Sequence, residues 1–189
     1  MKGVFARLLF IAAIIFSLPP LAFLAAGVTA PPQFVVEREK EVLAPPDRVW
    51  QVVTDWTALA GGMNKMMPKV GKRKVMGGTA PAAGRVVRYP LEDGRDWDQR
   101  ILAWDPPRKY EFRNDKGVSA GMPGDVTMHF DLAPAPGGFT TVRYRITVRP
   151  EGFVNRSLTH IFGIWLGTLR GYEDALLEVV KTKSEATGG

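Results

Sequence analysis

Apolar and polar residues alternate with a period of two through most of the segment 84–149, which is typical of strands with one buried and one wet face. Asp93-Gly94 interrupts one pair of alternating runs, and the sequence PAPGG at 134–138 interrupts another, so each pair predicts an antiparallel hairpin. The face of the second hairpin that we expect to be buried consists of Val126, Met128, Phe130, Leu132, Val142, Tyr144, Ile146 and Val148. A further alternating run at 35–44 contains the charged sequence EREKE, which suits a solvated edge strand.

Helical spacing replaces the period of two on either side of these strands. The segment 45–56 places a proline in the first turn and apolar residues at helical intervals, namely Val49, Trp50, Val53 and Trp56. A second, longer helix is expected from about Asn155 to Thr182, with a 4-3-4-3-4 apolar seam of Leu158, Phe162, Trp165, Leu169, Tyr172 and Leu176. The order strand, helix, antiparallel strands and long helix predicts an α+β domain in which a curved sheet wraps against the final helix.

Three glycines recur at every fourth residue within this expected helix: Gly163, Gly167 and Gly171. Each costs a helix about 0.8–1 kcal/mol relative to alanine, so the repetition calls for an explanation. On a continuous helix they lie mostly on the side opposite the apolar seam. Two interpretations stay open: the glycines loosen the helix so that it can flex as a lid, or they form a shallow groove for a partner, such as the N-terminal anchor or a second copy of the chain.

The first thirty residues do not read as part of the globular domain. Lys2 and Arg7 precede an uncharged run from Leu8 to Ala30, which exceeds the roughly 20 apolar residues that a membrane span needs. Cleavage after Ala30 is disfavoured by the proline that follows, but a signal peptide has the same positive start, so a retained anchor and a cleaved signal both remain. Either interpretation places the rest of the chain on the extracytoplasmic side, in the periplasm of a Gram-negative cell. We therefore expect an anchor or signal at 1–30, a linker at 31–33, a domain at 34–184 and a tail at 185–189.

The composition of the chain limits the kinds of functional site that it can contain. The chain of 189 residues has a formal charge of +6, no cysteine and two histidines. This excludes disulfides, zinc-thiolate sites, a cysteine nucleophile and a histidine-rich metal site. His129 falls on the wet face of its strand and His160 near the start of the last helix, and neither has neighbours that suggest a catalytic triad. No catalytic, metal-binding or cofactor-binding residues are predicted.

Three stretches of the sequence resemble a known family. VLAPPDRVWQVVTDW (42–56), RILAWDPPRKYEF (100–112) and HFDLAPAPGGFTTVRYRITVRPEG (129–152) are similar, in this order, to the SRPBCC or START-like helix-grip superfamily and within it to the polyketide cyclase/dehydrase-like branch. The resemblance covers about residues 34 to 184. It implies a helix-grip fold with a hydrophobic cavity between the curved sheet and the C-terminal helix, and it implies no universal catalytic residue.

The residues expected to line this cavity come from both helices and from one strand: Trp50, Val53, Tyr144, Phe162, Trp165, Leu169 and Tyr172. A segment in which methionines and basic residues interleave lies where the resemblance implies the cavity mouth, and its candidate portal or membrane-contact residues are Met63, Lys65, Met66, Met67 and Lys69. The alternative is an ordinary surface loop whose methionines fill the edge of the core. Nucleic-acid binding is disfavoured because no aromatic platforms interleave with these basic residues and because the chain carries an export segment.

Three functions remain open at this stage. The first is a membrane-tethered or exported protein that holds a lipid, quinone, isoprenoid or similar hydrophobic small molecule without a cofactor. The second is a cyclase/dehydrase-like enzyme acting on an apolar or polyketide-like substrate, which is disfavoured because the alternation leaves few inward-facing polar residues. The third is an interaction module without a ligand, in which tryptophans pack the cavity solid.

Overall fold

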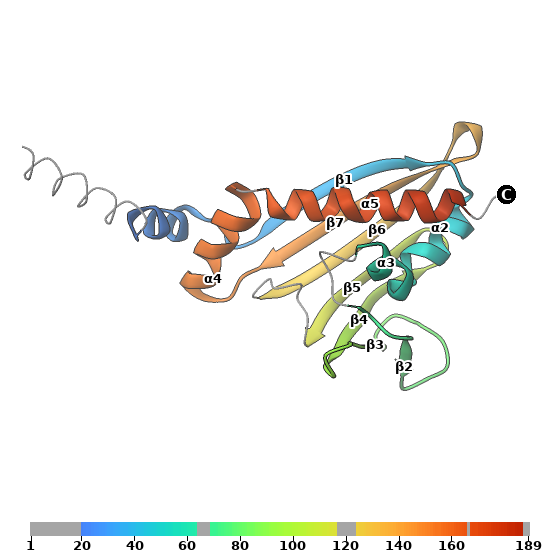
Figure 1. Ribbon diagram of the computed structural model, residues 1–189, viewed down its shortest axis with the longest axis horizontal. Helices are drawn as coiled ribbons and strands as arrows, with labels where there is room; N and C mark the ends of the chain where they lie inside the picture. Colours follow the sequence, from blue (N-terminus) through green and yellow to red (C-terminus); the bar gives the residue numbers. More distant parts are fainter. Residues whose placement is uncertain (1–19, 64–68, 117–123, 166, 187–189) are drawn as a thin grey trace, which may run out of the picture.

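Seven antiparallel strands form one sheet, and a long C-terminal helix crosses it (Figure 1). The computed structural model describes residues 20–63, 69–116, 124–165 and 167–186. The strand order is β1-β7-β6-β5-β4-β3-β2, so β1 is an edge strand, as its charged sequence predicts. The strands are β1 (Phe34–Val42), β2 (Lys74–Met76), β3 (Val86–Pro90), β4 (Asp96–Asp105), β5 (Lys109–Lys116), β6 (Asp125–Ala135) and β7 (Phe139–Arg149).

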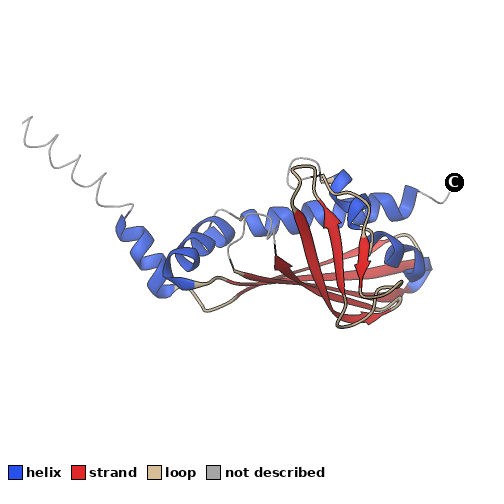
Figure 2. Ribbon diagram, turned by 90° about the horizontal axis from the view of Figure 1, so that it is seen from below, coloured by secondary structure: helices blue, strands red, loops and turns tan. Residues whose placement is uncertain are grey.

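Helices lie on one face of this sheet. Figures 1 and 2 show α5 running along β1 and β7, with α2 and α3 beside its C-terminal part. The short helices are α2 (Pro46–Val53), α3 (Trp56–Gly62) and the 3-10 turn η1 (Pro136–Gly138), and the C-terminal region contains α4 (Gly152–Leu158), the π-helical segment η2 (Thr159–Trp165) and α5 (Thr168–Ala186). The α+β helix-grip architecture is therefore confirmed.

Both predicted hairpins are present. β3 pairs with β4 across a turn in which Gly94 has a φ of 80°, and β6 pairs with β7 in continuous register. The face of β6 and β7 that was expected to be buried is at most 4% exposed and belongs to the main core. The opposite face carries ion pairs such as Arg143 with Glu39, at 2.8 Å between nitrogen and oxygen. His129 lies on that outer face, between Glu111 and Asp131.

The expected single helix from Asn155 to Thr182 is wrong. The segment divides into α4, η2 and α5, and Gly167, at the break before α5, adopts a φ of 67°. A π-helical segment shifts the phase of the side chains, and a left-handed residue ends a helix, so a seam calculated for one continuous helix does not hold across both. Phe162 is accordingly 52% exposed, whereas Tyr172 and Leu176, which follow the break, are buried.

The three glycines consequently do not share one helix face. Gly163 is buried within η2, Gly167 lies at the break, and Gly171 faces solvent from α5. The geometric basis for a glycine groove along a continuous helix is therefore absent, and a partner along Gly163, Gly167 and Gly171 has no support from this arrangement.

The hydrophobic N-terminal segment is described only in part. Residues 20–29 form a helix, and residues 1–19 lie outside the described part of the chain. Within the residues that the structure describes, no helix is both long and apolar enough to cross a bilayer.

Alanine substitutions at two of the glycines should have opposite effects on stability. Gly171→Ala is expected to raise the free energy of unfolding by about 0.4–1 kcal/mol, because a Cβ there meets no atom within 4 Å and alanine restricts the unfolded chain. Gly167→Ala is expected to lower it by about 1–2 kcal/mol, because an L-residue resists the left-handed conformation. Urea denaturation of both variants beside wild type measures the two effects. A stabilising Gly167→Ala would contradict the break in the helix.

Candidate functional site

A row of aromatic side chains crosses the inner face of the sheet. Trp104 pairs in register with Tyr110, Tyr110 with Phe130, and Phe130 with Tyr144, so the row spans β4 to β7. Neighbouring ring centroids are 5.3, 6.3 and 4.7 Å apart. Tyr110, Phe130 and Tyr144 are at most 1% exposed, so these rings make an apolar floor beneath the helices.

The buried face of α5 includes a glutamate. Its buried residues are Tyr172, Glu173, Leu176, Leu177, Val180 and Ser184, which follow helical spacing along one face. Glu173 is completely buried, although its neighbour in sequence, Asp174, is exposed and accepts a hydrogen bond from Arg38 Nε at 3.3 Å. A glutamate on a mostly apolar buried face is unusual, because burying a carboxylate is costly.

Glu173 and Tyr144 both lack hydrogen-bond partners among the described residues. Neither carboxylate oxygen of Glu173 nor the hydroxyl oxygen of Tyr144 has one, although all three atoms are buried. Most buried polar atoms in proteins are paired, because an unpaired one costs about 1–3 kcal/mol. These atoms can therefore still bond to a group placed between the sheet and α5.

Burial also raises the pKa values of Glu173 and Tyr144. Burial raises the pKa of Glu173 to about 8, and Asp174 adds to this rise while Arg38 opposes it. Burial, together with the nearby Tyr172 and Glu173, raises the pKa of Tyr144 well above its usual value. At neutral pH Glu173 is therefore a protonated carboxyl and Tyr144 a neutral phenol, and both can donate a hydrogen bond.

A second pair of polar side chains lies on the same face of the sheet. Gln99 on β4 and Asn114 on β5 are register partners and are buried. Each amide oxygen accepts one hydrogen bond, Gln99 Oε1 from the Tyr110 hydroxyl at 3.1 Å and Asn114 Oδ1 from Trp97 Nε1 at 3.0 Å. Their amide nitrogens have no partner among the described residues, so the pair offers further hydrogen-bond donors.

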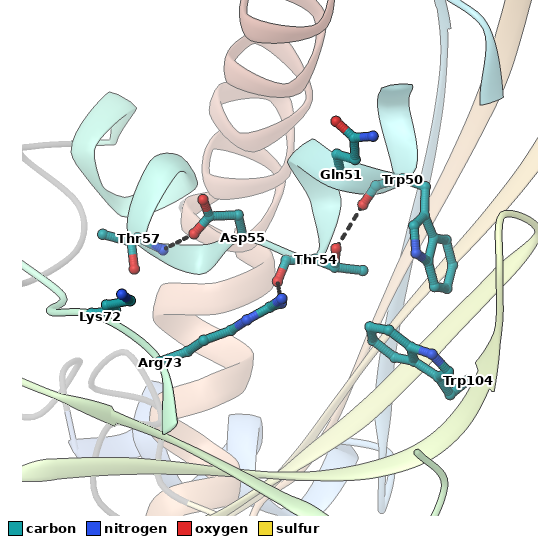
Figure 3. Close-up of a pocket in the computed structure, with 8 residues that line it drawn as sticks. All are labelled: Trp50, Gln51, Thr54, Asp55, Thr57, Lys72, Arg73 and Trp104. Atoms are coloured by element: carbon teal, nitrogen blue, oxygen red, sulfur yellow. Dashed lines mark hydrogen bonds between the residues drawn. The ribbon is translucent and has the colours of Figure 1, made fainter. Parts of the chain in front are cut away.

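A pocket of about 470 Å³ opens at the end of α2 (Figure 3). Its lining residues are Trp50, Gln51, Thr54, Asp55, Thr57, Lys72, Arg73 and Trp104. Figure 3 shows the two tryptophans together on one side, with ring centroids 5.0 Å apart, and the two cationic side chains on the other. Arg73 Nη1 donates to the carbonyl of Thr54 at 3.1 Å, and Asp55 caps α3 by accepting from the backbone N–H groups of Thr57 and Ala58.

Trp104 connects this pocket to the aromatic row, because it lines the pocket and also contacts Tyr110. Trp50 likewise contacts both Trp104 and Tyr110. The pocket is therefore an opening with basic residues on one side and with the aromatic floor of the sheet behind its tryptophans.

The residues predicted to line a cavity are only partly brought together. Trp50, Val53, Tyr144 and Tyr172 are buried in the core, whereas Phe162 is 52% exposed. The side chains of Trp165 and Leu169 lie outside the described part of the structure. Trp56 is also fully buried, where it packs against Trp97 and Phe112.

The predicted portal residues are described at two positions. Met63 is 3% exposed and belongs to the core, whereas Lys69 is exposed and its Nζ lies 3.2 Å from Glu92 Oε1. Lys65, Met66 and Met67 lie outside the described residues.

Glu173, Gln99 and Asn114 were not predicted from the sequence. Counting the helical phase from Thr168, after the glycine, places Glu173 on the face of Tyr172, Leu176, Leu177 and Val180. Period-two alternation between Trp97 and Ile101 would similarly have placed Gln99 on the inner face.

Comparisons with known proteins agree with the fold. Residues 33–176 match the family described as polyketide cyclase/dehydrase and lipid transport. The structure resembles protein MLL2253 from Mesorhizobium loti, with 16% identity, a TM-score of 0.58, and coverage of 82% of this chain and 100% of that one. It also resembles Ara h 8.0201, with 13% identity, a TM-score of 0.54, and coverage of 82% and 99%. No curated protein matches the chain in sequence.

The buried carboxyl predicts a pH dependence of stability. Since the pKa of Glu173 rises from 4.5 to about 8 on folding, the folded state binds one more proton than the unfolded state between these values. The contribution of Glu173 to stability is therefore fully present below about pH 4.5 and is lost as pH rises toward 8, at up to about 1.4 kcal/mol per pH unit.

Urea denaturation from pH 5 to pH 9 measures how the free energy of unfolding changes with pH. Glu173→Gln keeps the shape of the protonated acid and should remove the part of this change that is due to Glu173. Asp174→Asn is the matched control, because Asp174 is exposed on the same helix. Equal slopes in wild type and Glu173→Gln would show that Glu173 does not hold a proton at neutral pH.

Proposed function

The chain belongs to the polyketide cyclase/dehydrase and lipid transport family, and we propose that it binds a hydrophobic small molecule between the inner face of the sheet and α5. This proposal rests on Glu173 and Tyr144, two buried groups beside an aromatic floor that have no hydrogen-bond partner in the described part of the chain. Ligand sites typically combine apolar walls with a few convergent polar groups that fix orientation.

The polar groups define the kind of ligand. A protonated Glu173, the hydroxyl of Tyr144 and the amides of Gln99 and Asn114 can all donate hydrogen bonds. They suit an apolar molecule that carries uncharged acceptor oxygens, such as the carbonyl groups of a quinone or of a polyketide. An anionic group beside Glu173 would disfavour the ionised form of the glutamate further and would itself be costly to bury.

The pocket of Figure 3 supplies an entrance in this proposal. Trp50 and Trp104 offer a flat apolar surface, and Lys72 and Arg73 offer positive charge at the rim. Basic residues at such a place attract anionic groups. The uncharged run from Leu8 to Ala30 would hold the domain beside a membrane, on the extracytoplasmic side.

A second candidate function is an enzyme that transfers a proton through Glu173. A carboxyl whose pKa lies near neutrality can both donate and accept a proton at physiological pH. In that case Glu173 would protonate or deprotonate a bound carbonyl compound, and Tyr144 would stabilise the charge that develops on its oxygen.

Ligand uptake tests the main proposal. Delipidated protein is incubated with a bacterial membrane lipid extract, and native mass spectrometry identifies what it retains. Wild type is expected to retain an apolar, oxygen-containing compound. Tyr144→Phe and Glu173→Ala should each weaken binding by up to about tenfold, the equivalent of one hydrogen bond of roughly 1–1.4 kcal/mol.

Asp174→Asn serves as the control and should bind as wild type does, because Asp174 is exposed and ion-paired to Arg38. Absence of any retained compound, or equal binding by all four proteins, would refute a site at Glu173 and Tyr144. In D2O, a retained compound that takes up deuterium with time in wild type, but not in Glu173→Gln, would favour the enzyme.

A further inference from the structure

The helix of residues 20–29 packs against the domain through a narrow stripe of mostly small residues. Ala26 is completely buried and Ala30 is 6% exposed, and Ala30 belongs to the main core. The ring of Phe23 lies 6.1 Å from that of Phe153 on α4, in an edge contact. Positions 23, 26, 27 and 30 share one side of a helix, so this stripe is a docking face.

Gly27 is a point of close approach. A Cβ atom at this position would lie 2.3 Å from both Phe153 Cζ and Ser157 Oγ, which real Cβ atoms essentially never do. The contact therefore depends on a residue without a side chain, as in helix pairs that meet at glycine. Such a fit shows that the segment and α4 pack as parts of one structure.

The opposite side of the same helix is apolar and exposed. Leu21, Leu24 and Val28 are 59%, 52% and 77% exposed, and the segment 20–30 contains no charged residue. The hydroxyl of Thr29 donates to the carbonyl of Ala25 at 2.7 Å, which masks the polar side chain at this end. A helix that is apolar all round is normally buried on every side or surrounded by lipid.

The α4 helix extends this apolar surface. Phe153 and Val154 are 40% and 57% exposed. Figures 1 and 2 show the helix of residues 20–29 beside α4 at the end of the molecule opposite the C-terminus. The helix of residues 20–29 and α4 thus carry five exposed large apolar side chains at the same end of the molecule, and exposed apolar side chains gathered in one region usually mark an interaction surface.

We propose that residues 20–30 are retained in the mature protein, docked on α4, and that Leu21, Leu24, Val28, Phe153 and Val154 form a surface embedded in a lipid bilayer. This rests on the membrane tether of the proposed function. A bilayer, rather than a second copy, is indicated because the chain leads from this surface directly into the uncharged residues Leu8 to Pro19, with Lys2 and Arg7 beyond them. Removal of the segment would uncover the docking face of α4.

A consequence is that the domain is held in a fixed orientation on the membrane. Because the anchor packs on α4, only the short segment 31–33 separates the docked residues 20–30 from β1. The end that carries α4 would face lipid, and the far end of α5 would point away from it (Figure 1).

The absence of cysteine in the chain makes a direct test simple. Val154→Cys is labelled with an environment-sensitive fluorophore, and the full-length protein is reconstituted into vesicles of phosphatidylethanolamine and phosphatidylglycerol that contain nitroxide-labelled lipid. The fluorophore is expected to shift to the blue and to be quenched by the nitroxide. The matched control is Leu43→Cys, an exposed leucine just after the other end of β1, which should show neither effect.

The other outcomes overturn the proposal. A label at residue 154 that behaves like the label at residue 43 shows that this surface is in water. A blue shift without quenching shows that a protein, such as a second copy, covers it. An intact mass that lacks residues 1–30 shows that the segment is cleaved.

A second pair of variants tests the docking itself. Gly27→Leu in the Val154→Cys background should reduce quenching severalfold, because the new side chain pushes α4 away from the anchor. Ala25→Leu adds the same side chain on the exposed side and should leave quenching unchanged. Equal quenching in both variants would refute the contact. Ligand uptake, measured on the same proteins, tests the proposed function separately, because lost uptake with intact quenching refutes only the ligand site.

Discussion

The inner face of the sheet is almost entirely apolar, and its exclusion from water is the constraint on which the remaining structure depends. One helix cannot cover seven strands, so α5 lies over β1 and β7 while α2 and α3 lie beside its C-terminal part. Arg38 and Lys40 on β1 make ion pairs with Asp174 and Glu178 on α5, which fixes the side of the helix that faces solvent. The other side must then face the sheet, and Glu173 is carried inward with it.

The break at Gly167 divides the C-terminal region into two segments that make different contacts. After the break, α5 presents one continuous face to the core and places Glu173 near Tyr144. Before it, α4 receives the N-terminal helix at Gly27 and exposes Phe153 and Val154. In one straight helix the directions of all side chains are fixed relative to one another, so it could not make both sets of contacts. The left-handed conformation of Gly167 is unfavourable, but it lets α4 and α5 be oriented independently.

The sequence predicted the fold well where a pattern depended on neighbours alone. Alternation identified both faces of β6 and β7, and Asp93-Gly94 identified a turn, because both signals are local. The helical seam failed at Phe162, because a π-helical segment and a left-handed glycine depend on tertiary packing that spacing does not reveal. Glu173 was missed for a different reason: helical spacing places it beside Tyr172 and Leu176, but spacing does not show that a carboxyl is buried. Met63 is buried and Lys69 is exposed, although both belong to one short segment of the sequence. Composition alone could not predict this difference in burial.

The central claim is that a neutral Glu173 faces a ligand between the sheet and α5. Infrared difference spectroscopy of ligand-loaded against ligand-free protein at neutral pH tests it most directly, because the C=O stretch of a protonated carboxyl is separate from that of a carboxylate. A protonated-carboxyl band is expected to shift when the ligand binds and to be absent in Glu173→Gln. A difference spectrum without such a band, or one that Glu173→Gln leaves unchanged, would contradict it.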